Sequence, residues 1–103
     1  MFGNYSKSLD PKNRVIVPAK LRKELGNYFY LTVGPDRILE ARDAKSFDVF
    51  QNSLTSNNML NATARQFARL LLGNTEKVEV DKQGRIVLPK HLLESANITK
   101  DVV

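Results

Sequence analysis

The chain repeats one unusual sequence motif, and this duplication constrains its fold more than any other feature. The stretch DPKNRVIVPAKL at residues 10–21 returns as DKQGRIVLPKHL at residues 81–92. Asp, Arg, Pro and Leu recur at an offset of 71 residues, with three apolar residues between Arg and Pro. A chain of 103 residues is one small domain, or two very small units with a shared core. We therefore expect two copies of one local structure around a common core.

Each motif begins with residues that are typical of a tight hairpin. Asp at the first place suits a type I turn, and Asn or Gly at the fourth place tolerates a left-handed backbone. We therefore expect each repeat to open with a bulged hairpin, whose structural turn residues are Asp10, Asn13, Asp81 and Gly84. Its strands are predicted at residues 5–9 and 15–17 in the first repeat, and at residues 76–80 and 86–88 in the second.

A proline follows the second strand of each repeat and predicts the start of a helix. Proline is favoured in the first turn of a helix, where its missing N–H costs nothing. The two short helices predicted here, residues 19–25 and 90–96, end at Gly26 and Asn97. Both residue types favour the left-handed helix cap.

The first repeat continues with a second predicted hairpin, whereas the second repeat stops early. The β-prone residues 28–33 and 38–41 flank the turn sequence Gly-Pro-Asp-Arg. The equivalent strand of the second repeat would begin at residues 101–103, so we expect a truncated second repeat. The predicted organisation is a first repeat at 1–42, a helical connector at 43–73 and a second repeat at 74–103.

Two helices are predicted between the repeats. Asp43 is placed to cap a helix that runs to Leu54, and a second helix runs from about Asn61 to Leu72. Each helix carries an apolar stripe at helical spacing, which predicts packing in the core rather than a binding site. The stripes are Phe47, Phe50 and Leu54 in the first helix, and Ala64, Phe67, Ala68 and Leu71 in the second.

The basic surplus of the chain lies with the first repeat. The net charge is +5 and the isoelectric point is near 9.7. Residues 1–42 hold eight Lys and Arg against four Asp and Glu, whereas residues 73–103 hold five against five. A basic surplus indicates a polyanionic partner, and nucleic acid before a membrane because no basic amphipathic helix is present. A solvated basic surface without a ligand is the alternative.

The composition does not support an enzyme. The chain has no cysteine, its single histidine is His91, and its five glycines form no phosphate-binding loop. We therefore expect no cofactor, no metal site and no small-molecule substrate. The lack of an apolar signal or membrane segment predicts a cytoplasmic protein without a membrane partner.

The duplicated motif also resembles a known family. Asp-x-x-x-Arg followed by three apolar residues, Pro and a short helix is similar to the swapped-hairpin β-barrel family of AbrB, MazE and SpoVT. Two copies in one chain, represented by MFGNYSKSLDPKNRVIVPAKLRKEL and VEVDKQGRIVLPKHL, resemble the MraZ family over nearly the whole length. The resemblance implies an α+β fold in which both repeats form an AbrB-like barrel as a pseudo-dimer.

The same resemblance implies a function. It indicates a nucleoid-associated transcription regulator of the bacterial division and cell-wall gene cluster, which binds short tandem DNA boxes as a homo-oligomeric ring. The alternative is an antitoxin-like interaction module of the same fold, whose main partner is a toxin.

A protruding hairpin with a cation near its tip is able to enter a DNA groove as a two-stranded ribbon. The candidate DNA-binding residues are Arg14, Arg85, Lys12, Lys7, Lys20, Arg22, Lys23 and Lys82. The two turn aspartates are expected to orient the arginines. The alternative is that each Asp–Arg pair is only an internal salt bridge of its hairpin.

The second copy of the motif is less basic than the first. It has Gln83, Leu93 and Glu94 where the first copy has three Lys or Arg residues. We therefore expect Arg14→Ala to weaken DNA binding more than Arg85→Ala.

Overall fold

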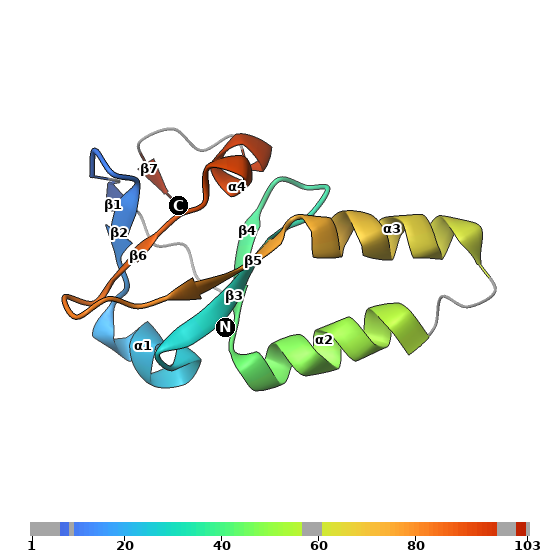
Figure 1. Cartoon of the computed structure of the whole chain (residues 1–103), viewed down its shortest axis with the longest axis horizontal. Coiled ribbons are helices and arrows are strands. Elements are labelled where there is room, and N and C mark those ends of the chain that lie inside the picture. The colour runs from blue at the N-terminus through green and yellow to red at the C-terminus, as the bar shows by residue number, and fades with distance from the viewer. Residues whose placement is uncertain (1–6, 9, 57–60, 97–100, 103) are drawn as a thin grey trace.

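Small antiparallel sheets and short helices form the α+β fold of the computed structural model, which describes residues 7–8, 10–56, 61–96 and 101–102 (Figure 1). The strands are β1 (Lys7–Ser8), β2 (Arg14–Ile16), β3 (Tyr28–Val33), β4 (Leu39–Arg42), β5 (Thr75–Glu79), β6 (Arg85–Val87) and β7 (Asp101–Val102). The helices are α1 (Ala19–Leu25), α2 (Ala44–Ser56), α3 (Ala62–Gly73) and α4 (Lys90–Ser95).

The helices α2 and α3 begin at capping residues, of which Asp43 was predicted as a cap and Asn61 as the approximate start of its helix. Asp43 Oδ1 accepts a hydrogen bond from the backbone N–H of Ser46 at 2.7 Å, and α2 begins at the next residue after Asp43. Asn61 Oδ1 accepts from the N–H of Ala64 at 3.0 Å at the start of α3. The two predicted post-proline helices are α1 and α4. Gly26 follows α1 with a φ of 86°, whereas Asn97 lies outside the described residues.

The strands of the two repeats alternate in space instead of forming two separate hairpins. β2 pairs with β6, β5 pairs with β3, and β1 pairs with β7, all antiparallel (Figure 1). The prediction that the strands before and after each motif turn form one continuous hairpin was therefore wrong beyond the turn itself. The strands β1, β2, β5 and β6 that flank the motif turns instead pair with strands of the other repeat. Only β3 and β4 pair within a repeat, as the predicted second hairpin, among the strands that the structure describes.

Both repeats contribute side chains to one hydrophobic core. Phe29 and Val33 of β3 and Leu92 of α4 are at most 2 % exposed. The other buried members of the cluster are Val17, Leu25, Leu31, Val78, Ile86, Leu88 and Leu93. Because the two repeats share this core, neither half buries its apolar residues alone. No closed barrel is present in the described part of the chain, whose sheets have two, two and three strands.

The α2–α3 pair extends away from the β2–β6 end of the molecule (Figure 1). Phe47 of α2 is buried, and its ring stacks on Tyr30 with 4.1 Å between the centroids. Ala68 and Leu71 of α3 are also buried, whereas Phe67 is 46 % exposed. Its assignment to the core was wrong, because the surface that α3 buries includes Ala68 and Leu71 but leaves Phe67 exposed. No helix within the described ranges is long and apolar enough to cross a membrane.

Candidate nucleic-acid interface

The two motif turns have the same backbone structure. The N–H of Asn13 donates to the carbonyl of Asp10 at 3.0 Å, and the N–H of Asp10 donates to the carbonyl of Arg14 at 3.0 Å. The second turn has the equivalent bonds at 3.0 Å and 2.7 Å. The fourth residue of each turn has a positive φ, 61° at Asn13 and 77° at Gly84. The predicted bulged turns are therefore present in both repeats.

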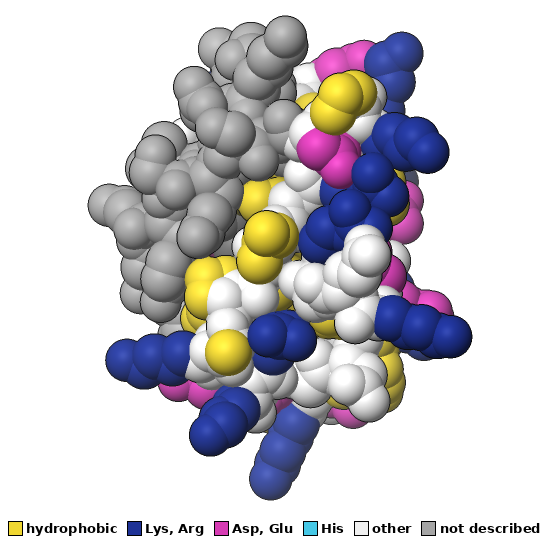
Figure 2. Space-filling view, turned by 90° about the vertical axis from the view of Figure 1, so that its left-hand side faces the viewer, with side chains coloured by type: hydrophobic (Ala, Val, Ile, Leu, Met, Phe, Trp, Pro, Cys, Tyr) yellow, Lys and Arg dark blue, Asp and Glu magenta, His cyan; other side chains and the backbone are white. Residues whose placement is uncertain are grey.

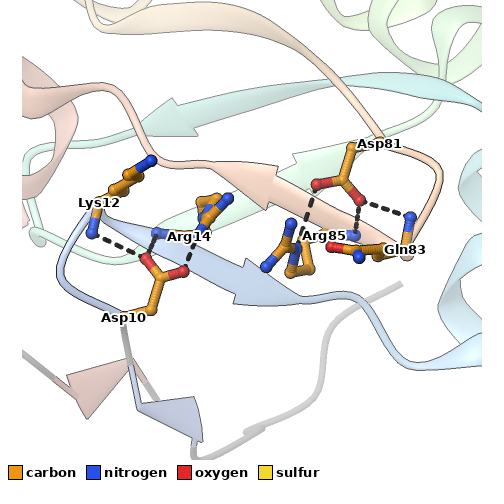
Figure 3. A network of polar contacts seen from close by, with 6 residues as sticks. All are labelled: Asp10, Lys12, Arg14, Asp81, Gln83 and Arg85. Atoms are coloured by element: carbon orange, nitrogen blue, oxygen red, sulfur yellow. Dashed lines mark hydrogen bonds and ion pairs between the residues drawn. The ribbon is translucent and has the colours of Figure 1, made fainter.

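The aspartate of the first turn holds both the backbone and the arginine. Asp10 Oδ1 accepts hydrogen bonds from the N–H groups of Lys12 and Arg14 at 2.9 Å and 2.8 Å (Figure 3). Its Oδ2 accepts from Arg14 Nε at 2.6 Å. One carboxylate thus fixes the turn and orients the guanidinium.

The second turn repeats this network. Asp81 Oδ1 accepts from the N–H groups of Gln83 and Arg85 at 2.8 Å and 2.9 Å (Figure 3). Its Oδ2 accepts from Arg85 Nε at 3.1 Å. The agreement between the two copies indicates that the motif itself specifies the geometry.

These contacts lower the pKa of both aspartates. The hydrogen bond from the backbone N–H of Arg14 is the largest cause that lowers the pKa of Asp10, and the guanidinium adds to it. The N–H of Arg85 lowers the pKa of Asp81 in the same way. Partial desolvation opposes both shifts without reversing them.

Each ion pair engages one of the three nitrogens of its guanidinium. A guanidinium has five N–H donors, and the aspartate engages Nε alone. Within the described residues, no further hydrogen bond engages Nη1 or Nη2 of Arg14 or Arg85. The two arginine side chains are 27 % and 26 % exposed. The internal salt bridges therefore exist, and each arginine side chain is still partly exposed.

The pairing of β2 with β6 brings the two arginines together. Arg14 lies opposite Val87, and Arg85 lies opposite Ile16. Residues two apart on a strand share a face, so the arginines are diagonal neighbours on one face of the ribbon, with Cα atoms roughly 7–8 Å apart. Figure 3 shows the two guanidiniums near the ribbon centre, between turns that lie at opposite ends. This proximity was not predicted from the sequence, because it depends on the pairing of β2 with β6.

The other basic candidates lie around this ribbon. Lys12 and Lys82 are exposed in the two turns, and α1 carries exposed Lys20, Arg22 and Lys23. Lys7 belongs to β1. Figure 2 shows Lys and Arg side chains spread over the end of the molecule that carries the ribbon, between a few hydrophobic side chains.

The first repeat places a cation on the turn of the second repeat. A Cβ added to Gly84 would lie 2.9 Å from Arg22 Nη1, so the guanidinium of α1 rests directly on this turn. The N–H of Val17 also donates to the carbonyl of Gly84 at 2.8 Å. The residue of α4 equivalent to Arg22 is Leu93, which is 8 % exposed and belongs to the core.

The described residues offer no alternative metal centre. None of them form a group of three or more His, Asp or Glu side chains that could hold an ion. His91 Nε2 lies 3.5 Å from Glu76 Oε1, and both side chains are more than 40 % exposed.

Comparison with known proteins identifies the family. The family model described as "MraZ protein, putative antitoxin-like" matches residues 1–70 and 71–103. The transcriptional regulator MraZ of Mycoplasmopsis pulmonis is 50 % identical over the whole chain, which spans 70 % of that protein. The proteins of the same name from Mycoplasma mobile and Clostridium beijerinckii are 47 % and 45 % identical, over 100 % and 99 % of the chain and 70 % and 72 % of their own lengths. The chain therefore belongs to the MraZ family.

Proposed function

We propose that this chain is a DNA-binding transcription regulator that reads duplex DNA with its β2–β6 ribbon. The observation that carries this proposal is the pair of aspartate-oriented guanidiniums on one exposed face of the ribbon. The related proteins named transcriptional regulators support the regulatory role. The proposed role is a binding function and requires no catalytic residue or cofactor.

The ribbon matches the size and chemistry of a DNA groove. The major groove of B-DNA is about 12 Å wide and admits a two-stranded β-ribbon. Arg14 and Arg85 would donate their Nη hydrogens to guanine O6 and N7 or to phosphate. Asp10 and Asp81 would position the arginines without touching DNA. Phosphate contacts that carry no sequence information are assigned to Lys7, Lys12, Lys20, Arg22, Lys23 and Lys82.

The proposed architecture treats residues 1–42 and 74–103 as two repeats of a swapped-hairpin barrel, joined by the connector 43–73. The interleaved strands and the shared core support this organisation. We propose further that several chains form a ring on short tandem boxes, which raises affinity through multivalency. Cytoplasmic and nucleoid localisation, with the division and cell-wall genes as targets, completes the proposal by family resemblance.

Binding to the DNA upstream of its own coding region tests the function. The protein is titrated with this duplex and with a shuffled duplex of the same composition, at several salt concentrations. We expect a preference for the upstream DNA and an affinity that falls steeply with salt. R14A/R85A should lose the preference, whereas the control R69A on the exposed surface of α3 should keep it. Equal, weak binding to both duplexes would contradict the proposal.

The second candidate function is an antitoxin-like interaction module, which the description of the matching family favours. Such a module would bind a toxin as its main partner. Indifference to DNA in the titration above, at every salt concentration, would favour this function over the regulator.

A further inference from the structure

The DNA-facing surface of the proposed ribbon carries two exposed apolar side chains between its arginines. Ile16 is 58 % exposed and Val87 is 55 % exposed. Ile16 lies opposite Arg85, and Val87 lies opposite Arg14, so all four side chains share one face. On the other face of the same ribbon, Ile86 is 5 % exposed and packs in the core. The alternation of the strands therefore places Ile16 and Val87 on the exposed face of the ribbon.

The arrangement is repeated by the two halves of the molecule. Each repeat presents Arg and then, two residues later, a β-branched aliphatic side chain on the same face. A single exposed apolar residue on a strand needs no explanation. Here two such residues alternate with two oriented guanidiniums in one patch. A ligand for this patch must offer hydrogen-bond acceptors next to small apolar groups.

The edges of bases in the major groove offer this combination. Guanine presents the acceptors O6 and N7, and thymine presents a 5-methyl group that apolar side chains contact. Residues two apart on a strand are separated by about 6.8 Å, which is close to two base steps of about 3.4 Å each. A ribbon that lies along the groove would thus place an aliphatic side chain about two base pairs from each arginine.

We propose that Ile16 and Val87 recognise thymine methyl groups about two base pairs from the bases that Arg14 and Arg85 contact. This inference rests on the proposed DNA-binding function and adds a specificity determinant to it. Ile16 and Val87 confer discrimination between thymine and a base that lacks the methyl group, whereas the arginines and lysines supply the bulk of the affinity.

Replacement of thymine by uracil removes only the methyl group and therefore tests this inference. The upstream duplex is prepared with thymidine and, separately, with deoxyuridine at every thymine position. Burial of one methyl-sized group favours binding by roughly threefold to fivefold, so two contacts predict a preference of about tenfold for the thymine duplex. I16A/V87A should bind both duplexes equally. V49A, which removes an equally exposed aliphatic group from α2, should retain the preference.

The outcomes separate this inference from the function on which it rests. Equal binding of the native protein to both duplexes, with preference for the upstream sequence intact, would overturn the inference alone. A thymine preference that persists in I16A/V87A would also overturn it, because the methyl groups would then be read elsewhere. Failure to distinguish the thymine duplex from shuffled DNA would overturn the proposed function and this inference together.

Discussion

The two motif turns have nearly the same internal hydrogen bonds, but different residues of the other repeat contact them. This difference indicates that the two repeats contribute unequally to the proposed DNA-binding surface. In both turns one carboxylate binds two backbone N–H groups and one guanidinium. The N–H of Leu88 donates to the carbonyl of Asn13 in the first turn, and the N–H of Val17 donates to the carbonyl of Gly84 in the second. Each turn thus binds the backbone of the other repeat, but only the second turn also contacts a guanidinium of α1, that of Arg22.

Because of these contacts, positive charge is distributed differently in space than along the chain. Along the chain, residues 1–42 carry a surplus of four positive charges, and residues 73–103 carry none. In space, Arg22 of the first repeat lies on the turn of the less basic second repeat. The second turn therefore has two guanidiniums within reach, Arg85 and Arg22, and Leu93 provides no equivalent cation to the first.

The largest predicted difference concerns the two motif arginines. A bidentate contact from Arg to a base contributes about 1–3 kcal/mol, so R14A should reduce the affinity for the upstream DNA roughly 5-fold to 150-fold. R85A should reduce it less, because Arg22 remains at the second turn. Fluorescence anisotropy at matched salt measures both losses. Equal losses, or a larger loss in R85A, would break the proposed asymmetry.

Removal of Arg22 should abolish that asymmetry. We expect R22A to weaken binding modestly in the native chain and several-fold more strongly in R85A, since it then removes the last guanidinium at the second turn. The losses of binding free energy in R22A and R14A should be additive in the double mutant. K23A is the matched control for this coupling, because Lys23 is exposed on the same helix, whereas the atoms nearest to Gly84 all belong to Arg22. Equal coupling free energies of R22A with R14A and with R85A would contradict the assignment of Arg22 to the second turn.

A smaller effect is expected on stability from the fourth turn residues. Gly84 has a φ of 77°, and an added Cβ would meet Arg22. G84A should therefore destabilise the fold by about 1–2 kcal/mol, the cost of an L-residue in the left-handed region. N13A should cost less, because Asn13 already carries a Cβ in this conformation. Urea unfolding measures both variants, and equal costs would contradict the larger penalty that the left-handed backbone and the Arg22 contact predict at Gly84.

The smallest effect is the acid sensitivity of the two turns. The folded pKa values of Asp10 and Asp81 are lowered, so their contribution to stability is complete above the unfolded pKa of about 3.9 and is lost as the pH falls below it. Urea midpoints between about pH 2.5 and 6 should thus decline below about pH 4. D10N should flatten this decline more than D81N, because Asp10 has the shorter ion pair, 2.6 Å against 3.1 Å. Curves for both variants that run parallel to the native curve would contradict this role.

Features with a local physical cause were predictable from the sequence. The left-handed backbone at Asn13 and Gly84 follows from residue type, and the helix starts follow from Asp43, Asn61 and the two prolines. These interactions join residues at most four positions apart, so no knowledge of the tertiary fold was needed. The Asp–Arg networks belong to this class, since each joins residues four positions apart.

Features that depend on distant pairing were not predictable. The residue types do not show that β2 pairs with β6. The alternation of apolar and polar residues along a strand indicates which face is buried, but not which strand is adjacent. The proximity of Arg14 to Arg85 and the contact of Arg22 with Gly84 both follow from that pairing. The exposure of Phe67 was not predicted for a related reason. The spacing of apolar residues on a helix does not show how much of that face other elements bury.

Site-specific crosslinking tests most directly whether DNA lies on the β2–β6 ribbon. The chain has no cysteine, so single cysteines can carry a photoreactive maleimide at chosen positions. Ile16 and Val49 are exposed aliphatic residues of similar accessibility, on the ribbon and on α2 respectively. We predict that labelled I16C crosslinks to the upstream duplex and that labelled V49C does not. Crosslinking from V49C with none from I16C would contradict the ribbon as the DNA-binding surface.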